Sequence, residues 1–297
     1  MKVSRLGRLF DPLKYADGFT HASTPFLDSH EEKLRVIFNR RDENQRSHVF
    51  SIDLKCSDSS FYLGTELKHH LGPGQTGSFD DSGISVGSIC KLGDERLFFY
   101  MGWNLGVTVP WRNSIGVTRV LENLELQKFK IAPLLDRSEE DPFTMSYPWV
   151  IKNKDLYYMF YGSNSTWDTS KADIDHNLRL RISSDCKNWR YEGKLSIALS
   201  ENANAFCRPS VLKISNQFYM AYAFRGDKYK IGFAKSSNLI DWEHVHTFKA
   251  EPNNEWESEE VTYPSLFNYM NKVFLLYCGN GYGKSGFGIA EIKDLNK

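Results

Sequence analysis

Five short runs of aromatic and aliphatic residues recur along the chain at a nearly constant interval. The intervals between matching aromatic positions are 62, 61, 61 and 55 residues, and the aligned residues are Phe38, Tyr100, Tyr161, Tyr222 and Tyr277. A second apolar stretch precedes each run, and in four of the five a proline stands 13 residues before the aligned aromatic residue. A fixed internal period indicates a fold built from one repeated supersecondary unit.

Each repeat is predicted to contain four antiparallel strands. Polar turns such as residues 153–155 and 215–217 join the first two apolar stretches, which is typical of a hairpin. A third stretch follows, and in two repeats a turn then leads to a tryptophan, Trp189 or Trp242, on a fourth strand. No long amphipathic helical pattern competes, although residues 60–82 show no clear alternation. Four-stranded units repeated radially form an all-β propeller, here one of five blades.

The 297 residues are therefore interpreted as a single propeller domain. The fifth repeat ends near Asp294, before a fourth strand can form, so a strand at residues 3–10 is expected to close the ring. The five blades are predicted at roughly 20–60, 80–130, 143–195, 205–248 and 258–294.

Charge and composition limit the partners of such a chain. Lys and Arg together number 37, as do Asp and Glu, so no overall field attracts nucleic acid or an anionic membrane. The first residues lack the apolar run of a secretory signal, and no apolar run is long enough to span a membrane. The five cysteines form no CxxC pair and the histidines have no zinc-ligand spacing. We expect a cytoplasmic protein without metal or cofactor.

The first strand of each blade lines the central channel of a propeller, so residues just before these strands are expected at one mouth of the channel. Acidic candidates there are Asp80 and Asp81 in blade two, and Glu259 and Glu260 in blade five. Other candidates that precede or begin the first strands are His21, Tyr147, Arg208 and Tyr263.

Several motifs resemble those of the five-bladed propeller glycoside hydrolases and phosphorylases, which include arabinanases, xylosidases, invertase-like fructosidases and mannoside phosphorylases. The aromatic strands end in Tyr-x-Gly at Tyr100 and Tyr277, and the resemblance covers residues from about 20 to 294. It implies an enzyme that cleaves a glycosidic bond in a small sugar or oligosaccharide. Such cleavage uses two carboxyl groups about 5 to 10 Å apart.

The resemblance assigns roles to the candidates at the mouth. Asp80 or Asp81 would form the acid/base pair with Glu259 or Glu260. The residues expected to orient the sugar are His21, Trp103, Tyr147, Arg208 and Tyr263.

Two departures from the family pattern leave other functions open. Those hydrolases usually carry Asp in the first blade and Asp-Pro in the third, whereas this chain has Thr24-Pro25 and Tyr147-Pro148. Phosphorolysis needs one carboxyl acid and a cradle for inorganic phosphate, which Arg208, Arg225 and His21 would supply. A non-catalytic glycan- or partner-binding propeller is a second alternative. A sugar-transferring or sugar-modifying enzyme of surface-polysaccharide synthesis is a third.

Each candidate also has a structural interpretation. Asp80 and Asp81 would cap a turn through side-chain to backbone hydrogen bonds. Residues 257–260 would form a solvated loop, and Arg208 would form a salt bridge with a buried carboxylate.

Overall fold

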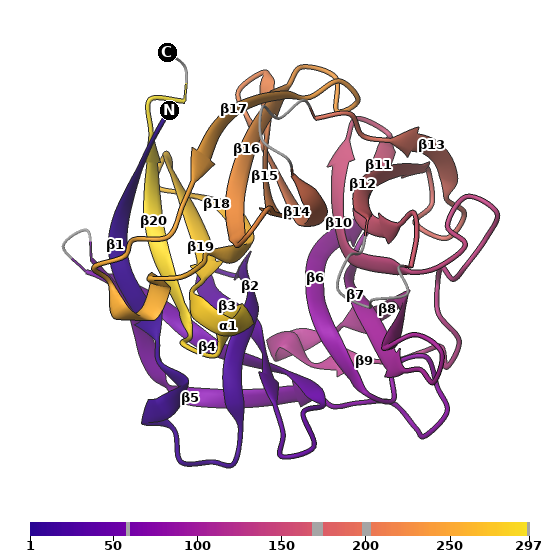
Figure 1. Ribbon diagram of the computed structural model, residues 1–297, viewed down its shortest axis with the longest axis horizontal. Helices are drawn as coiled ribbons and strands as arrows, with labels where there is room; N and C mark the ends of the chain where they lie inside the picture. The colour runs from indigo at the N-terminus through magenta and orange to yellow at the C-terminus, as the bar shows by residue number, and fades with distance from the viewer. Residues whose placement is uncertain (58–59, 168–174, 198–202, 296–297) are drawn as a thin grey trace.

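The computed structural model describes residues 1–57, 60–167, 175–197 and 203–295. Its antiparallel sheets radiate from a central axis and form a five-bladed β-propeller (Figure 1). This arrangement confirms the predicted all-β fold class. Helical structure among the described residues is limited to short turns, of which α1 (Asn280–Gly283) contributes to the site described below.

Each blade has four strands, ordered from the axis outward. Blades one and two contain β2 (Thr20–His30), β3 (Lys33–Arg41), β4 (Ser47–Ser57), β5 (Ser60–Leu71), β6 (Gly83–Leu92), β7 (Glu95–Leu105), β8 (Trp111–Val120) and β9 (Leu126–Gln127). Blades three and four contain β10 (Met145–Asn153), β11 (Leu156–Asn164), β12 (His176–Ser183), β13 (Arg190–Lys194), β14 (Asn204–Ile214), β15 (Gln217–Arg225), β16 (Tyr229–Ser236) and β17 (Glu243–Phe248). Blade five contains β18 (Thr262–Tyr269), β19 (Lys272–Cys278), β20 (Phe287–Lys293) and β1 (Lys2–Phe10).

The two ends of the chain meet in blade five. Strand β1 pairs antiparallel with β20, from Lys2 opposite Lys293 to Phe10 opposite Phe287. Phe10 is buried, and its ring lies 5.5 Å from that of Phe287 and 4.7 Å from that of Phe38 in blade one. The first strand of the chain thus completes the last blade and packs against the first.

Blade one extends further than the boundary near residue 60 that the sequence indicated. Its outer strand β5 runs to Leu71 and pairs with β4 along most of its length. Most residues of β5 are exposed or half-buried, so the strand lacks a clear apolar alternation. That is why the pattern of residues 60–82 predicted no strand.

The aromatic runs form the second strand of each blade. Phe98, Phe99 and Tyr100 of β7 are consecutive and fully buried, as are most residues of β15. Neighbouring blades cover both faces of these strands, which is why the apolar residues are continuous rather than alternating. Most of the aromatic content is therefore packing between blades.

Every inner strand is interrupted by a bulge toward its N-terminal end. The register of each inner strand with its neighbour shifts at this point, and in four blades the residue before a proline has a positive φ. These residues are Thr24, Tyr147, Arg208 and Tyr263, with φ between 49° and 51°. Positive φ is uncommon for non-glycine residues, and bulges redirect side chains. Three of these side chains, Tyr147, Arg208 and Tyr263, contact other blades, whereas Thr24 donates to Asn39 of its own blade.

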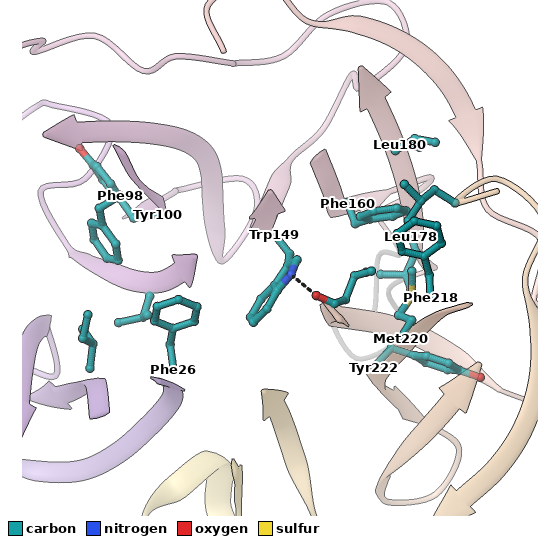
Figure 2. Close-up of a cluster of buried hydrophobic side chains, with 14 of the residues drawn as sticks. Phe26, Phe98, Tyr100, Trp149, Phe160, Leu178, Leu180, Phe218, Met220 and Tyr222 are labelled. Carbon is teal, nitrogen blue, oxygen red and sulfur yellow. Dashed lines mark hydrogen bonds between the residues drawn. The ribbon is translucent and has the colours of Figure 1, made fainter. Parts of the chain in front are cut away.

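Trp149 occupies the channel below the bulges. Its indole nitrogen donates a hydrogen bond to the carbonyl of Val211 at 3.0 Å, and its ring lies 5.5 Å from that of Phe26 (Figure 2). It thus connects blades three, four and one. Because the channel is filled at this level, a ligand has to be bound above it.

Candidate functional site

Ten side chains surround the end of the channel where the inner strands begin, and we call this set the mouth. They come from blades one, three, four and five and from α1. Their members are His21, Arg41, Tyr147, Arg208, Arg225, Tyr229, Glu260, Tyr263, Tyr282 and Lys284.

Arg208 forms the floor of the mouth. Its side chain is fully buried, and its Nη1 and Nη2 atoms donate to the carbonyls of Gly87 at 2.9 Å and Pro25 at 3.4 Å. Its guanidinium carbon lies 5.5 Å from the ring centroid of Trp149. Burial lowers the pKa of Arg208 to about 10, so the side chain stays charged at neutral pH.

A structural role for Arg208 was expected to involve a salt bridge with a buried carboxylate, and its contacts are of another kind. Within the described residues no carboxylate pairs with it, and its Nε atom has no hydrogen-bond partner. The two carbonyls that it contacts belong to bulges of blades one and two. Arg208 therefore links three blades and leaves its positive charge uncompensated beneath the mouth.

Four tyrosines form an aromatic wall. The hydroxyls of Tyr147 and Tyr263 lie 3.2 Å apart, a contact between blades three and five. The ring of Tyr282 lies 6.3 Å from that of Tyr263 and 5.7 Å from that of Tyr229. Burial raises the pKa of Tyr147 and of Tyr263, so both keep their O–H donors. Tyr282 is 41% exposed and offers its ring to a ligand. Flat rings with hydroxyl groups suit a ligand that has both apolar and polar faces, such as a sugar.

His21 and Glu260 occupy equivalent positions in blades one and five, each four residues before the proline of its inner strand. Glu260 is largely buried, and its Oε1 atom accepts a hydrogen bond from the backbone N–H of Tyr282 at 3.2 Å. The imidazole of His21 contacts the hydroxyl of Thr20 at 2.9 Å through Nδ1.

The turn α1 brings blade five to blade one. Gly283 has a φ of 92° and lies so close to β2 that a Cβ there would be 2.4 Å from the carbonyl oxygen of Ala22. Only glycine fits this approach. The contact places Lys284 within electrostatic range of His21.

Positive charge predominates in the mouth. Burial, followed by Arg41 and Lys284, lowers the pKa of His21 to about 4, so this histidine is neutral at pH 7. Burial and Glu260 raise the pKa of Tyr282, whereas Arg225 opposes that rise. The ten mouth residues thus include four cations, Arg41, Arg208, Arg225 and Lys284, and one carboxylate, Glu260. Because the whole chain has no net charge, this local excess favours an anionic group in the ligand.

The structure places Asp80 against the second strand of blade two, where a Cβ at Gly102 would lie 2.7 Å from its Cβ atom. Its carboxylate accepts hydrogen bonds from Tyr100 at 3.2 Å and Ser78 at 2.8 Å, and it pairs with Lys128 at 2.6 Å. The ring of Tyr100 extends over the third strand, because a Cβ at Gly116 would lie 2.2 Å from its Cζ atom. These contacts favour the structural interpretation of Asp80.

Asp80 belongs to a set of three buried acids that we call the blade acids: Asp80, Asp141 and Glu257. Each stands 20 residues before the aligned tyrosine of its blade, which are Tyr100, Tyr161 and Tyr277 respectively.

Each of the other two blade acids pairs with arginine. Asp141 accepts from Tyr161 at 2.8 Å and pairs with Arg181 at 2.6 Å and Arg179 at 3.3 Å. Glu257 pairs with Arg5 of β1 at 3.1 Å. The repetition shows that this acid, tyrosine and cation arrangement is part of the blade architecture.

The remaining sequence candidates are dispersed. Asp81 accepts from the backbone of Gly77 at 2.9 Å, as a turn-capping residue does. Glu259 is exposed and pairs with Lys228 at 3.3 Å. The indole nitrogen of Trp103 donates to Ser47 at 2.9 Å, a contact between blades two and one. No hydrogen bond or ion pair among the described residues joins Asp80 or Asp81 to Glu259 or Glu260.

Four mouth residues were not among the sequence candidates: Arg41, Tyr229, Tyr282 and Lys284. The repeat could have identified Arg41. It ends β3 opposite Thr20, and Arg225 ends β15 opposite Asn204 in the same way. Both stand three residues after the aligned aromatic position, at the mouth end of a second strand. Tyr282 lies in α1 and Lys284 directly follows it. The position of this turn depends on the contact of Gly283 with β2 and has no pattern in the repeat.

The fold is a five-bladed propeller similar to that of solved glycoside hydrolases, including ones of families GH43 and GH32. A structure named "Glycoside hydrolase" has a TM-score of 0.78 at 14% identity, and the match covers 98% of this chain and 92% of that one. An endo-arabinase from Bacteroides thetaiotaomicron VPI-5482 has a TM-score of 0.65 at 11% identity, with 98% and 99% covered. For the Bombyx mori GH32 beta-fructofuranosidase BmSUC1 the TM-score is 0.64 at 12% identity, with 95% and 62% covered. These likenesses establish the fold.

Closer relatives are found by sequence. "Uncharacterized protein Rv1502" of Mycobacterium tuberculosis (strain ATCC 25618 / H37Rv) is 36% identical over 300 residues, which cover 99% of this chain and 100% of the relative. "Uncharacterized protein MT1551" of strain CDC 1551 / Oshkosh matches to the same extent. The chain belongs to the family of these two mycobacterial proteins. No family model matches it.

Proposed function

We propose that the protein acts on a sugar at the mouth, with Glu260 as the proton-transferring carboxyl group and phosphate as a reactant or as part of the substrate. The observation that carries this proposal is the charge composition of the mouth: it has one largely buried carboxylate, Glu260, and four cations, of which Arg41 and Lys284 act on His21 and Arg225 acts on Tyr282. The tyrosine wall beside Glu260 supplies ring faces and hydroxyls for a sugar. The likeness in fold to glycoside hydrolases supports a carbohydrate as the ligand.

Phosphorolysis fits the mouth better than hydrolysis by a carboxyl pair. Hydrolysis needs two carboxyl groups on either side of the bond that breaks, whereas Asp80 and Asp81 are engaged elsewhere in blade two. In phosphorolysis the acid form of Glu260 donates its proton to the glycosidic oxygen as the bond between that oxygen and the anomeric carbon breaks. A phosphate oxygen forms the new bond to the anomeric carbon. The products are a sugar 1-phosphate, the released alcohol and the Glu260 carboxylate.

The cations would act on phosphate in this scheme. Arg41, Arg225 and Lys284 offer N–H donors at the rim, and Arg208 adds its charge from below. Arginine binds phosphate oxygens in a fork, which also orients the attacking oxygen. His21 is neutral in the free protein, so its ring can either donate or accept a hydrogen bond there.

Glycan binding without catalysis is the second candidate. It is supported by the residues at the bulges of blades one and three, which are Thr24 and Tyr147 rather than acids. A binding protein would use the same tyrosine wall and the same cations but would need no proton transfer by Glu260.

A screen of nitrophenyl glycosides with and without inorganic phosphate tests the proposal. We expect release of nitrophenol that depends on phosphate and is abolished by Glu260→Gln. Asp80→Asn is the matched control, since it also neutralises a largely buried acid and should retain the activity of the folded protein. Phosphate-independent release would indicate hydrolysis. Binding without release, unchanged by Glu260→Gln, would favour the glycan-binding alternative.

A further inference from the structure

An ordered loop with exposed aliphatic side chains projects from the mouth side of blade two. It runs from Leu105, the last residue of β7, to Trp111, the first residue of β8, and we call residues 105–111 the apolar loop. Val107 is 99% exposed and Leu105 is 73% exposed. The backbone N–H of Gly106 donates to the carbonyl of Pro110 at 3.4 Å, and that of Leu105 donates to the hydroxyl of Ser82 at 3.2 Å. These bonds form a closed turn that holds both aliphatic side chains in solvent.

Two tryptophans stand at the base of the apolar loop. The rings of Trp111 and Trp167 lie 5.2 Å apart with an interplanar angle of 71°, and they connect blade two with blade three. Both residues are partly exposed. Tryptophan combines an apolar ring with an N–H donor, so it favours the boundary between water and lipid.

A cation lies beside the loop, whereas the acid at its base, Asp81, is engaged with Ser82 at 3.0 Å and with the backbone of Gly77 at 2.9 Å. Arg112 follows Trp111 directly and is partly exposed. Within the described residues it forms no ion pair or side-chain hydrogen bond. The rim cations Arg41 and Lys284 lie on the same side of the propeller as the apolar loop, because all stand at the ends of strands that reach the mouth.

We propose that the apolar loop inserts into the headgroup region of an anionic membrane and turns the mouth toward the lipid surface. Two exposed aliphatic side chains, a tryptophan pair and an unpaired arginine are the components of a peripheral membrane anchor. Among the described residues no helix is long and apolar enough to cross a membrane. The proposal departs from the expectation of no membrane partner, which rested on overall charge and on the lack of a spanning run.

Vesicle co-sedimentation tests this proposal with the full-length protein. Vesicles of phosphatidylcholine that contain phosphatidylglycerol should sediment the protein, whereas pure phosphatidylcholine vesicles should bind it much less. Replacing both aliphatic residues, by Leu105→Asp with Val107→Asp, should reduce the bound fraction at least about tenfold, since it removes two buried aliphatic side chains from the bilayer.

Met270→Asp is the matched control. Met270 is 74% exposed, close to the value for Leu105, but it lies in the turn between β18 and β19 on the opposite side of the propeller. This variant should bind vesicles like the unsubstituted protein. An equal loss for Met270→Asp, or no binding of the unsubstituted protein to anionic vesicles, would overturn the proposal. A loop variant that changes only the oligomeric state would instead assign the apolar loop to contacts between copies.

Vesicle binding and catalysis can be tested separately. Glu260→Gln leaves the apolar loop intact, so it should bind vesicles normally even where it abolishes turnover. Tryptophan fluorescence gives a second readout, because insertion of Trp111 should shift the emission to shorter wavelength only with anionic vesicles.

Discussion

The blade acids and Glu260 show two different uses of a buried carboxylate within one blade architecture. Asp80 and Asp141 each accept a hydrogen bond from the tyrosine 20 residues later and pair with a cation of an outer region of the blade. Glu260 follows Glu257 by only three residues, yet it accepts from the backbone of Tyr282 and faces the mouth. Neighbouring acids in sequence can therefore have separate roles.

The features that recur in every blade stabilise the blades. The side chains that differ between equivalent positions form the mouth. The bulge before a proline recurs in four blades, but its residue is Thr24, Tyr147, Arg208 or Tyr263. The backbone device is the same while the side chains differ in charge, size and hydrogen bonding. The repeated bulge thus directs three side chains toward other blades, whereas that of Thr24 stays within blade one.

The largest effect on stability is expected from Asp141→Asn. This change leaves Arg179 and Arg181 without their buried counter-charge, which should lower the free energy of unfolding by about 3 to 5 kcal/mol. Urea unfolding followed by circular dichroism measures the change. Asp81→Asn is the control and should cost less than about 1 kcal/mol, because Asp81 lies in a partly exposed turn. An equal loss of unfolding free energy in the two variants would show that Asp141 stabilises the fold no more than an acid in a partly exposed turn does.

A smaller loss of stability is expected from Arg208→Lys, which tests whether a mouth residue can also hold blades together. A single ammonium group cannot replace the planar fork that reaches the carbonyls of both Gly87 and Pro25. We expect the free energy of unfolding to fall by about 2 kcal/mol. A variant as stable as the parent in urea would show that the contacts across the channel are dispensable.

The smallest effect concerns the titration of His21 in the folded protein. Its pKa of about 4 arises from burial first and then from Arg41 and Lys284, so a bound anion should raise the value toward 6.5. Lys284→Met should raise it as well, because one of the cations is removed. Nuclear magnetic resonance titration of the imidazole signal, with and without inorganic phosphate, measures both changes. An unchanged pKa in phosphate would argue against an anion site in the mouth.

The same shift predicts how His21 contributes to stability as pH changes. Its folded pKa lies below the unfolded value of 6.5, so the unfolded chain binds more protons between pH 6.5 and 4. The contribution of His21 therefore becomes unfavourable as pH falls through this window. His21→Gln should weaken the acid dependence of the urea midpoint there.

The fold could be predicted from the sequence because every blade contains the same buried second strand. Residues such as Tyr100 and Tyr161 mark the period directly. Strand β5 was missed because its partly exposed residues carry no such pattern. The 20-residue interval from Asp80 to Tyr100 and from Asp141 to Tyr161 was also present, and it would have identified Asp80 as a blade acid.

The mouth could be predicted only in part. Arg208, Tyr147 and Tyr263 follow from their place before the prolines of inner strands. The contribution of Lys284 depends on a close approach of Gly283 to blade one, across the point where the ring closes. No spacing within one blade encodes that contact, because it joins segments from opposite ends of the chain.

Measuring turnover and unfolding of Glu260→Gln and Asp80→Asn separates the roles of the two buried acids. We expect opposite effects. Glu260→Gln should reduce phosphate-dependent turnover by about a hundredfold or more with little change in the urea midpoint. Asp80→Asn should lower the midpoint clearly, because it leaves Lys128 and Tyr100 without their partner, and should retain turnover in the folded protein. Loss of turnover in a stable Asp80→Asn protein, with Glu260→Gln fully active, would contradict the account.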